Sequence, residues 1–194
     1  MEGKTKGIGF VALREFVMDR YGLDGWTDVL AEVSSADRAA FEGIVTMGWY
    51  SLPLYARALR AVDKVRGSGD LQLAFQLGKY QAERDLTTVH RAFLRIANPS
   101  FILEQSAEYW GRFHDSGTWT VERMGPTRVR AYLDGWAHVD AVLCREVSGY
   151  LLKAFELVGA RNPRLEHAQC RARGSGRCLF AGAWGEADTD FPPR

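Results

Sequence analysis

Cysteine is scarce in this chain: there are three among 194 residues. An odd number argues against a disulfide framework and leaves buried thiols, a redox thiol or metal ligands as the possible roles. Long apolar runs are also lacking. The N-terminal stretch MEGKTKGIGFVALREF has no signal-peptide core, and no window approaches the ~20 apolar residues of a membrane span. We therefore expect a cytoplasmic protein with no membrane span.

Charge of one sign is not in excess either. Lys and Arg together number 25 against 24 Asp and Glu, which gives a formal net charge of +1. No general attraction to nucleic acid follows from such a balance, so no nucleic-acid partner is expected. The sequence also lacks GxGxxG, Walker, HExxH and GxSxG motifs, and it offers no nucleophile in a recognisable setting. These absences predict a chain that is not an enzyme.

What is present begins with helices. Hydrophobic residues make up 46% of the chain, enough for one sizeable core. The stretch GIGFVALREFVMDRYG has an apolar stripe at helical spacing, formed by Phe10, Leu13, Val17 and Tyr21. Gly22 is expected to end this helix, and Ser51 with Pro53 to begin a later one. We predict a helical N-terminal part over residues 1–113.

The pattern changes after Gly117. Alternating polar and apolar residues predict a strand around Trp119, and Gly125-Pro126 turns the chain into a second strand. A long helix over roughly 137–158 and a hairpin around Gly-Ser-Gly at 174–176 complete a ββαββ unit.

The predicted fold class is thus α+β, with helices followed by a four-stranded antiparallel sheet. We expect one domain over 1–184, in which 114–184 form the ββαββ part. The polar tail, 185–194, is expected to be disordered.

Three of the seven cysteines and histidines lie in EHAQCRARGSGRCLF, namely His167, Cys170 and Cys178. Cys144 lies on the predicted long helix. If the hairpin packs on that helix, three thiolates and one imidazole form the closed tetrahedral set that structural zinc favours. Because His167 and Cys170 have opposite parity in a regular strand, Cys170 must lie where the strand bends. Thiols packed as small apolar groups remain the alternative.

The pattern of Cys144, Gly149-Tyr150 and HAQCRARGSGRCLF resembles the C-terminal half of 4-vinyl reductase-type domains, which bind small molecules in bacterial sensors. In those sensors a helix cysteine, an acidic residue and two hairpin cysteines hold a zinc. The resemblance implies a structural zinc bound by Cys144, His167, Cys170 and Cys178, with His167 where those sensors have glutamate.

In the same sensors the ligand lies between sheet and helices, close to the zinc. Candidate ligand-binding residues at that place are Trp119, Val121, Tyr150, Leu151 and Leu165. A solid core is the alternative, because most aromatic residues serve packing.

The opening KGIGFVALREFVMDRYGLDGWTDVL resembles that of haem nitric-oxide-binding domains, and the whole chain resembles uncharacterised paralogous proteins of myxobacteria. Haem nitric-oxide-binding domains use a proximal histidine and a Tyr-x-Ser-x-Arg triad, whereas the corresponding region here reads EYWGRFHDSGTW. His90 is the candidate axial ligand, and we interpret it as a surface or half-buried helix residue. The expectation is a chain with no haem.

Together these resemblances imply a sensor or signalling module with a structural zinc, which binds a small apolar or aromatic ligand and acts on an unknown protein partner. A homodimer is expected. The alternative is a non-enzymatic interaction scaffold similar to the small subunits of vesicle-tethering (TRAPP) complexes, which pair through helical faces.

Overall fold

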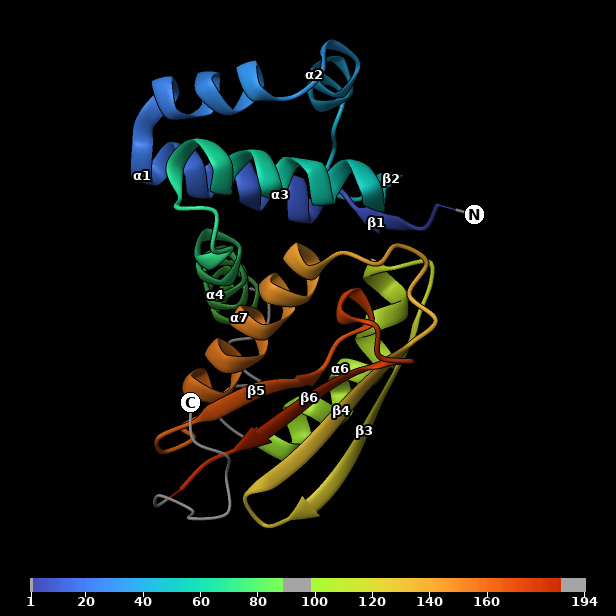
Figure 1. Cartoon of the computed structure of the whole chain (residues 1–194). Coiled ribbons are helices and arrows are strands. Elements are labelled where there is room, and N and C mark those ends of the chain that lie inside the picture. The colour runs from blue at the N-terminus through green and yellow to red at the C-terminus, as the bar shows by residue number, and fades with distance from the viewer. Residues whose placement is uncertain (1, 89–98, 186–194) are drawn as a thin grey trace.

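The computed structural model describes residues 2–88 and 99–185 (Figure 1). The N-terminal part contains β1 (Lys4–Lys6), α1 (Ile8–Glu32), α2 (Ser35–Glu42), β2 (Trp49–Ser51), α3 (Leu52–Arg66), α4 (Gln72–Thr88) and α6 (Pro99–Phe113). The remainder contains β3 (Thr118–Gly125), β4 (Arg128–Asp134), α7 (Ala141–Leu157), β5 (Arg164–Gln169) and β6 (Cys178–Ala183). The predicted order of helices followed by ββαββ is confirmed. None of the described helices is long and apolar enough to cross a membrane.

The four main strands form one antiparallel sheet in the order β3-β4-β6-β5. Alternate residues face the helices, and cross-strand pairing aligns them in rows such as Trp119, Leu133 and Cys178, or Val121, Ala131, Phe180 and His167. Helix α6 packs on β3 and α7 packs on β5, so both helices cover this inner face. The core continues from the sheet through α7 into α1 and α3.

Helix α1 turns back on itself at Gly22, where a φ of 69° interrupts the helical backbone. The two limbs run side by side in Figure 1. The sequence correctly marks Gly22 as the point where the first helix ends, and Ser51 as a helix start, since its Oγ accepts the Leu54 N–H at 3.3 Å. The paired strands β1 and β2 were not expected, because three residues each are too few to show a period of two.

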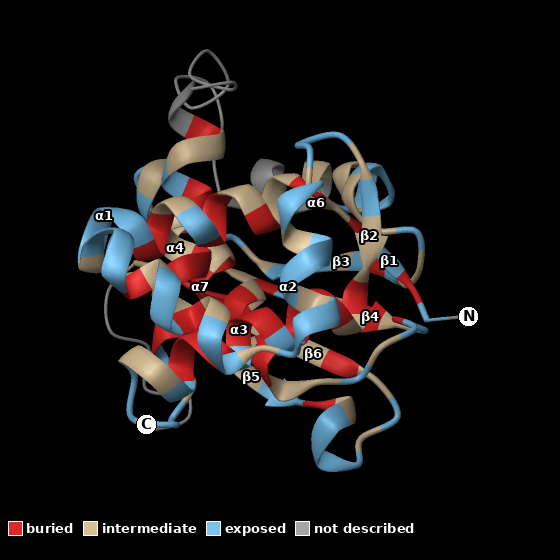
Figure 2. Cartoon of the chain, turned by 90° about the horizontal axis from the view of Figure 1, so that it is seen from above, coloured by how far each residue is buried: buried red, intermediate tan, exposed pale blue. Residues whose placement is uncertain are grey.

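Helices α4 and α7 cross with their backbones in contact. A Cβ added to Gly78 would lie 1.9 Å from the carbonyl oxygen of Glu146, and one added to Gly149 would lie 1.9 Å from that of Phe75. Only glycine fits at either position. Figure 2 shows the buried residues gathered where α3, α4 and α7 meet. This crossing fixes the height of α7 above the sheet, and therefore the place of Cys144.

A buried polar group ties the same three helices together. The Tyr55 hydroxyl donates to Glu146 Oε1 at 2.5 Å and accepts from Gln81 Nε2 at 2.8 Å. Burial raises the pKa of Glu146 to about 7, although its hydrogen bonds from Tyr55 and Gln81 act in the opposite sense. The sequence gives no sign of this group, because its members lie on three helices far apart in the chain.

Candidate metal centre

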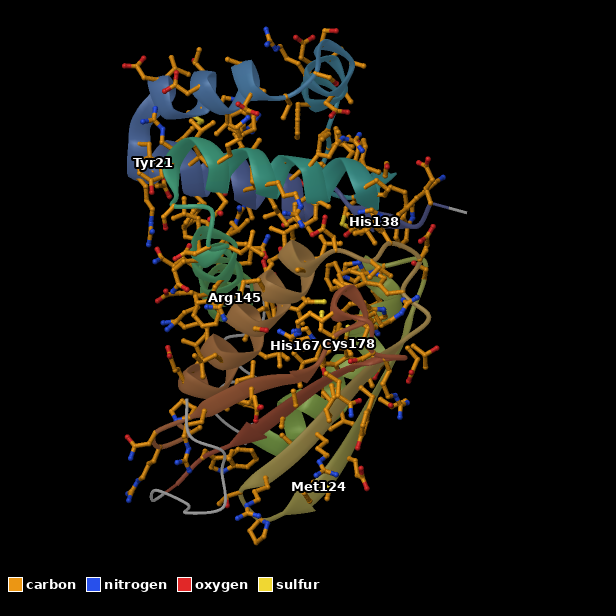
Figure 3. The ribbon with its side chains drawn as sticks, viewed as in Figure 1. Tyr21, Met124, His138, Arg145, His167 and Cys178 are labelled. Carbon is orange, nitrogen blue, oxygen red and sulfur yellow. The ribbon has the colours of Figure 1, made fainter. Side chains whose placement is uncertain are left out.

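Four donor side chains converge between α7 and the β5–β6 hairpin. Cys144 lies in the first turn of α7, His167 in β5, Cys170 just after β5 and Cys178 at the start of β6. One ligand atom from each lies within 4.8 Å of all the others. In Figure 3, His167 and Cys178 lie side by side below α7. The structure therefore brings together all four residues that the sequence singles out.

The spacing within this cluster suits a tetrahedral ion. The Sγ atoms of Cys144 and Cys178 are 3.6 Å apart. Two sulfur ligands of a tetrahedral zinc, each ~2.3 Å from the ion, are about 3.8 Å apart. All three cysteines are buried and none forms a disulfide. The four side chains therefore form a Cys₃His ligand set, and no other protein group lies between the sulfurs of Cys144 and Cys178.

A bend at the end of β5 makes this convergence possible. The pairing of β5 with β6 shifts register between His167 and Gln169. The chain then enters a short 3₁₀ turn at Arg171–Arg173, and Gly174 leaves it with a φ of 89°. The Cys170 N–H donates to Ser175 Oγ at 3.3 Å, which holds the turn closed. The bend predicted from the parity of His167 and Cys170 is confirmed.

Local hydrogen bonds favour a thiolate at Cys178. The hydrogen bond with the Cys144 thiol is the main reason that the pKa of Cys178 falls to about 4. The Arg171 backbone N–H, 3.4 Å from Cys178 Sγ, and the electrostatic effect of the nearby His167 ring act in the same direction. The pKa of Cys144 is raised, because its thiol is the partner in that hydrogen bond and is itself buried. One sulfur is thus already prepared to act as an anionic ligand.

His167 completes the set with an atom that otherwise lacks a partner. Its ring stacks on Phe180, with centroids 4.4 Å apart and planes inclined by 6°. Among the described residues, its Nε2 atom is buried and has no hydrogen-bond partner. Buried polar atoms are normally satisfied. A metal ion between this nitrogen and the sulfurs would satisfy it.

Three arginines of the hairpin hold it to its surroundings. Arg171 Nη1 donates to the Trp136 carbonyl oxygen at 2.5 Å, and Arg173 Nη2 donates to the His167 carbonyl oxygen at 2.7 Å. Arg177 forms a two-pronged ion pair with Asp134. The guanidinium groups are thus committed to protein oxygens, and it is the Arg171 backbone that contacts a ligand sulfur.

A row of neighbouring aromatic rings, most of them stacked, leads away from the cluster, and the sequence did not suggest it. From Phe180 the row continues to Trp119 at 5.5 Å, from Trp119 to Trp110 at 5.3 Å, and from Trp110 to His114 at 4.1 Å between ring centroids. His114 in turn pairs with Thr5 of β1 through an isolated bridge. The row connects the candidate metal ligand His167 with the N-terminal strand.

The five candidate ligand-binding residues do not all share one place. Trp119, Val121, Leu151 and Leu165 belong to the main core, where Trp119 also donates to the Ser106 hydroxyl at 2.8 Å. Tyr150 packs instead in a separate small cluster with Ala82, Leu86 and Ala154. A pocket formed by these residues stays a prediction.

His114 is an uncharged imidazole in an aromatic setting. Trp110 stacks on its face, and Trp136 meets it at 82° with centroids 5.3 Å apart. Part of the residue remains accessible, but Nδ1 is enclosed and, among the described residues, has no hydrogen-bond partner. Burial lowers the pKa of His114 to about 3, and the neighbouring Asp115 acts in the opposite direction.

This lowered pKa predicts a loss of stability in mild acid. Below the ordinary histidine pKa of ~6.5 the unfolded chain takes up a proton that the folded chain refuses until pH ~3, so stability falls as the pH decreases between these values. We expect His114→Phe to reduce the slope of unfolding free energy against pH by about 1 kcal/mol per unit between pH 6 and 4. Urea unfolding at a series of pH values measures it, with His138→Phe as the control. Equal slopes in wild type and His114→Phe would contradict the assignment.

Comparison with known proteins gives the fold a context. No family model matches the chain, and no curated protein matches it. An H-NOX protein from S. oneidensis in the Fe(II)NO state has a TM-score of 0.72 at 14% identity, covering 93% of this chain and 99% of that one. The chain has the fold of H-NOX proteins. A second such protein, unliganded Fe(II) H-NOX from K. algicida, gives a TM-score of 0.69 at 14% identity over 96% of this chain and 100% of that chain. An IWP-051-bound H-NOX from Shewanella woodyi gives a TM-score of 0.67 at 17% identity, covering 95% of this chain and 98% of that one.

These neighbours correct one expectation and support another. The expected absence of haem is contradicted, because the similar structures are H-NOX proteins in Fe(II) states and a further one concerns haem redox potential. The resemblance to haem nitric-oxide-binding domains is supported at the level of fold. The comparisons do not support the resemblances to 4-vinyl reductase-type domains or to the myxobacterial paralogues.

Besides His167, the described residues offer His114 as an imidazole with a buried ring nitrogen and the chemistry of an iron ligand. His114 is neutral and its Nδ1 is unpartnered within the described ranges. Trp110 and Trp136 pack against its ring, so they would have to move to admit a planar group there. His90, the axial candidate from the sequence, lies outside the described residues.

Proposed function

We propose that the chain is a cytoplasmic, non-enzymatic ligand-binding module in which a structural zinc joins α7 to the β5–β6 hairpin. The observation that carries the proposal is the convergence of Cys144, His167, Cys170 and Cys178 within 4.8 Å. Three sulfurs and one nitrogen are the donor types that zinc prefers over magnesium or calcium. A full protein ligand set leaves no position for water, so the ion serves structure rather than catalysis.

The organic ligand of this module is proposed to be small and apolar or aromatic. Its binding residues would be Trp119, Val121, Leu151 and Leu165, which lie in or against the core cluster that also contains the three cysteines. Tyr150 is left out, because it packs against a different group of residues. A change at this place would reach the hairpin through Phe180, which touches both Trp119 and His167.

We also propose that two copies of the module pair. The loop before β2 and the first residue of that strand expose three large apolar side chains, Val45, Met47 and Trp49, with 62%, 68% and 41% of their surfaces accessible. Lys6 fixes this loop, since its Nζ donates to the Met47 carbonyl oxygen at 2.9 Å and lies 4.0 Å from the centre of the Trp49 ring. An ordered apolar surface of this kind favours association.

One sample tests these proposals together. Native mass spectrometry of freshly purified protein should show a mass increment of one zinc per chain, an additional small organic molecule, and a dimeric species. Elemental analysis checks the metal, and the absorption spectrum of the same sample reports haem. Folded protein with no bound metal and three titratable thiols would contradict the zinc, and a chain that carries no organic molecule would contradict the ligand.

A further inference from the structure

The helical half of the chain has a hollow of its own, away from the candidate metal ligands. This open hollow of about 390 Å³ is bordered by α3 on one side and by the junction of α1 and α2 on the other. Its apolar surface includes Val33 and Ala61, and three cationic side chains of α3 line it: Arg57, Arg60 and Lys64. Ligand pockets commonly have volumes of ~300–1,000 Å³. The hollow therefore has room for a small molecule.

Each of these cations is held in place by a carboxylate from a different element. Arg57 donates through Nε and Nη2 to Asp37 at 2.8 and 2.7 Å. Arg60 donates in the same way to Asp140 at 2.9 and 2.5 Å. Lys64 pairs with Glu32 at 2.5 Å. The cationic side chains remain accessible, at 53% for Arg57, 50% for Arg60 and 70% for Lys64.

This arrangement is preorganised for an oxyanion. A guanidinium fixed along one edge loses little conformational entropy when it binds a further acceptor. In both arginines the carboxylate engages only Nε and Nη2. Helix α2 also begins at the hollow, where Ser34 is its N-cap, so the positive end of its dipole faces the same region.

We propose that this hollow binds a small molecule bearing a phosphate or carboxylate group, with Arg57 and Arg60 contacting the oxyanion and the apolar part resting on Val33 and Ala61. The carboxylates of Asp37 and Asp140 keep the hollow nearly neutral when it is empty. Because the net charge is low, a ligand would gain its affinity from directed hydrogen bonds with the guanidinium groups rather than from net charge alone.

Asp140 connects the hollow with the metal centre, because it pairs with Arg60 and caps the helix that carries Cys144. Asp140 is the N-cap of α7: its side chain accepts the Val142 N–H at 2.9 Å, and its carbonyl oxygen accepts the Cys144 N–H at 3.4 Å. An oxyanion bound to Arg60 would share that guanidinium with Asp140 and so alter the hydrogen bonding of the first turn of α7. The ligand in the hollow would thereby influence the position of Cys144.

Titration of the full chain with inorganic phosphate and with phenyl phosphate, followed by calorimetry or amide NMR shifts, tests the proposal. We expect saturable binding of one equivalent, with phenyl phosphate the tighter because of its apolar ring. Arg57→Gln and Arg60→Gln should each weaken binding by at least about tenfold, since each removes charge-assisted hydrogen bonds. Lys64 pairs with the surface residue Glu32, so Lys64→Gln leaves the Asp140 cap of α7 intact. This variant should weaken phosphate binding several-fold.

Arg112→Gln is the matched control, because Arg112 is 59% exposed and paired with Glu108 but lies far along the chain in α6. It should bind both probes as the wild type does, and thermal melting should show all variants folded. The proposal is overturned if binding shows no saturation below about 10 mM, or if Arg112→Gln weakens it as much as the α3 variants do. Neither result bears on the zinc, which is measured separately.

Discussion

Replacement of Gly149 by alanine is expected to destabilise the fold by more than about 3 kcal/mol, because the new methyl group would overlap the Phe75 carbonyl oxygen. Backbone cannot move aside as a flexible side chain can, so α4 and α7 would have to separate along their crossing. A total stability of ~5–15 kcal/mol leaves little margin for such a loss. Gly78→Ala should act similarly, since its clash is with the Glu146 carbonyl oxygen. Urea denaturation followed by far-UV circular dichroism measures both.

Gly111→Ala in α6 is the control for this result. No atom lies within 4 Å of a Cβ added there. The same substitution in an open helical position should stabilise by about 0.5–1 kcal/mol, through helix propensity alone. An unfolding midpoint of Gly149→Ala at or above that of the wild type would show that the two helices do not approach as closely as described.

The second large effect is expected at the metal centre. Cys178→Ser should yield protein without zinc and with severely reduced stability or solubility, because structural zinc in small peptides binds with ~10–16 kcal/mol. The alternative of packed thiols predicts a milder change of ~1–3 kcal/mol, the cost of a poorly satisfied hydroxyl. Zinc content and unfolding free energy, measured on the same preparation, separate the two.

Two further variants sharpen this test. His167→Cys supplies a fourth sulfur at the same position and should retain one zinc per chain. Ser175→Ala removes the hydroxyl that accepts the Cys170 N–H, but it takes away no ligand. It should keep its zinc and lose only about 1 kcal/mol. Loss of metal in Ser175→Ala but not in Cys178→Ser would be incompatible with the proposed ligand set.

The ββαββ part could be predicted from sequence because its signals are local. Trp119 and Val121 alternate with polar residues, and the Gly-Ser-Gly turn marks a hairpin. The bend at Cys170 followed from its parity with His167, so the convergence of the four ligand atoms needed only one assumption, that the hairpin packs on the helix. Such inferences depend on residues that are neighbours in the chain or in one strand pair.

Features formed by distant segments escaped prediction. Gly78 and Gly149 look like weak points of two separate helices until the crossing shows that each makes room for the other. The arginines of α3 look like an ordinary solvated face, because their partners Asp37 and Asp140 come from other elements. The judgement on haem failed for a related reason. It relied on the absence of the short Tyr-x-Ser-x-Arg triad, whereas the fold shared with H-NOX proteins persists at 14% sequence identity.

The ring row from His114 to His167 has a practical consequence for anyone who studies this chain. Trp110 and Trp119 lie nearly parallel, inclined by 13° with centroids 5.3 Å apart, so their electronic transitions couple and should give a characteristic near-ultraviolet dichroism signal. Phe180 places Trp119 one ring away from the candidate ligand His167. The coupled Trp110–Trp119 pair is thus an intrinsic spectroscopic probe of the hairpin. The dichroism of this indole pair, unlike the summed emission of all six tryptophans, can follow changes around His167 in real time with no dye attached.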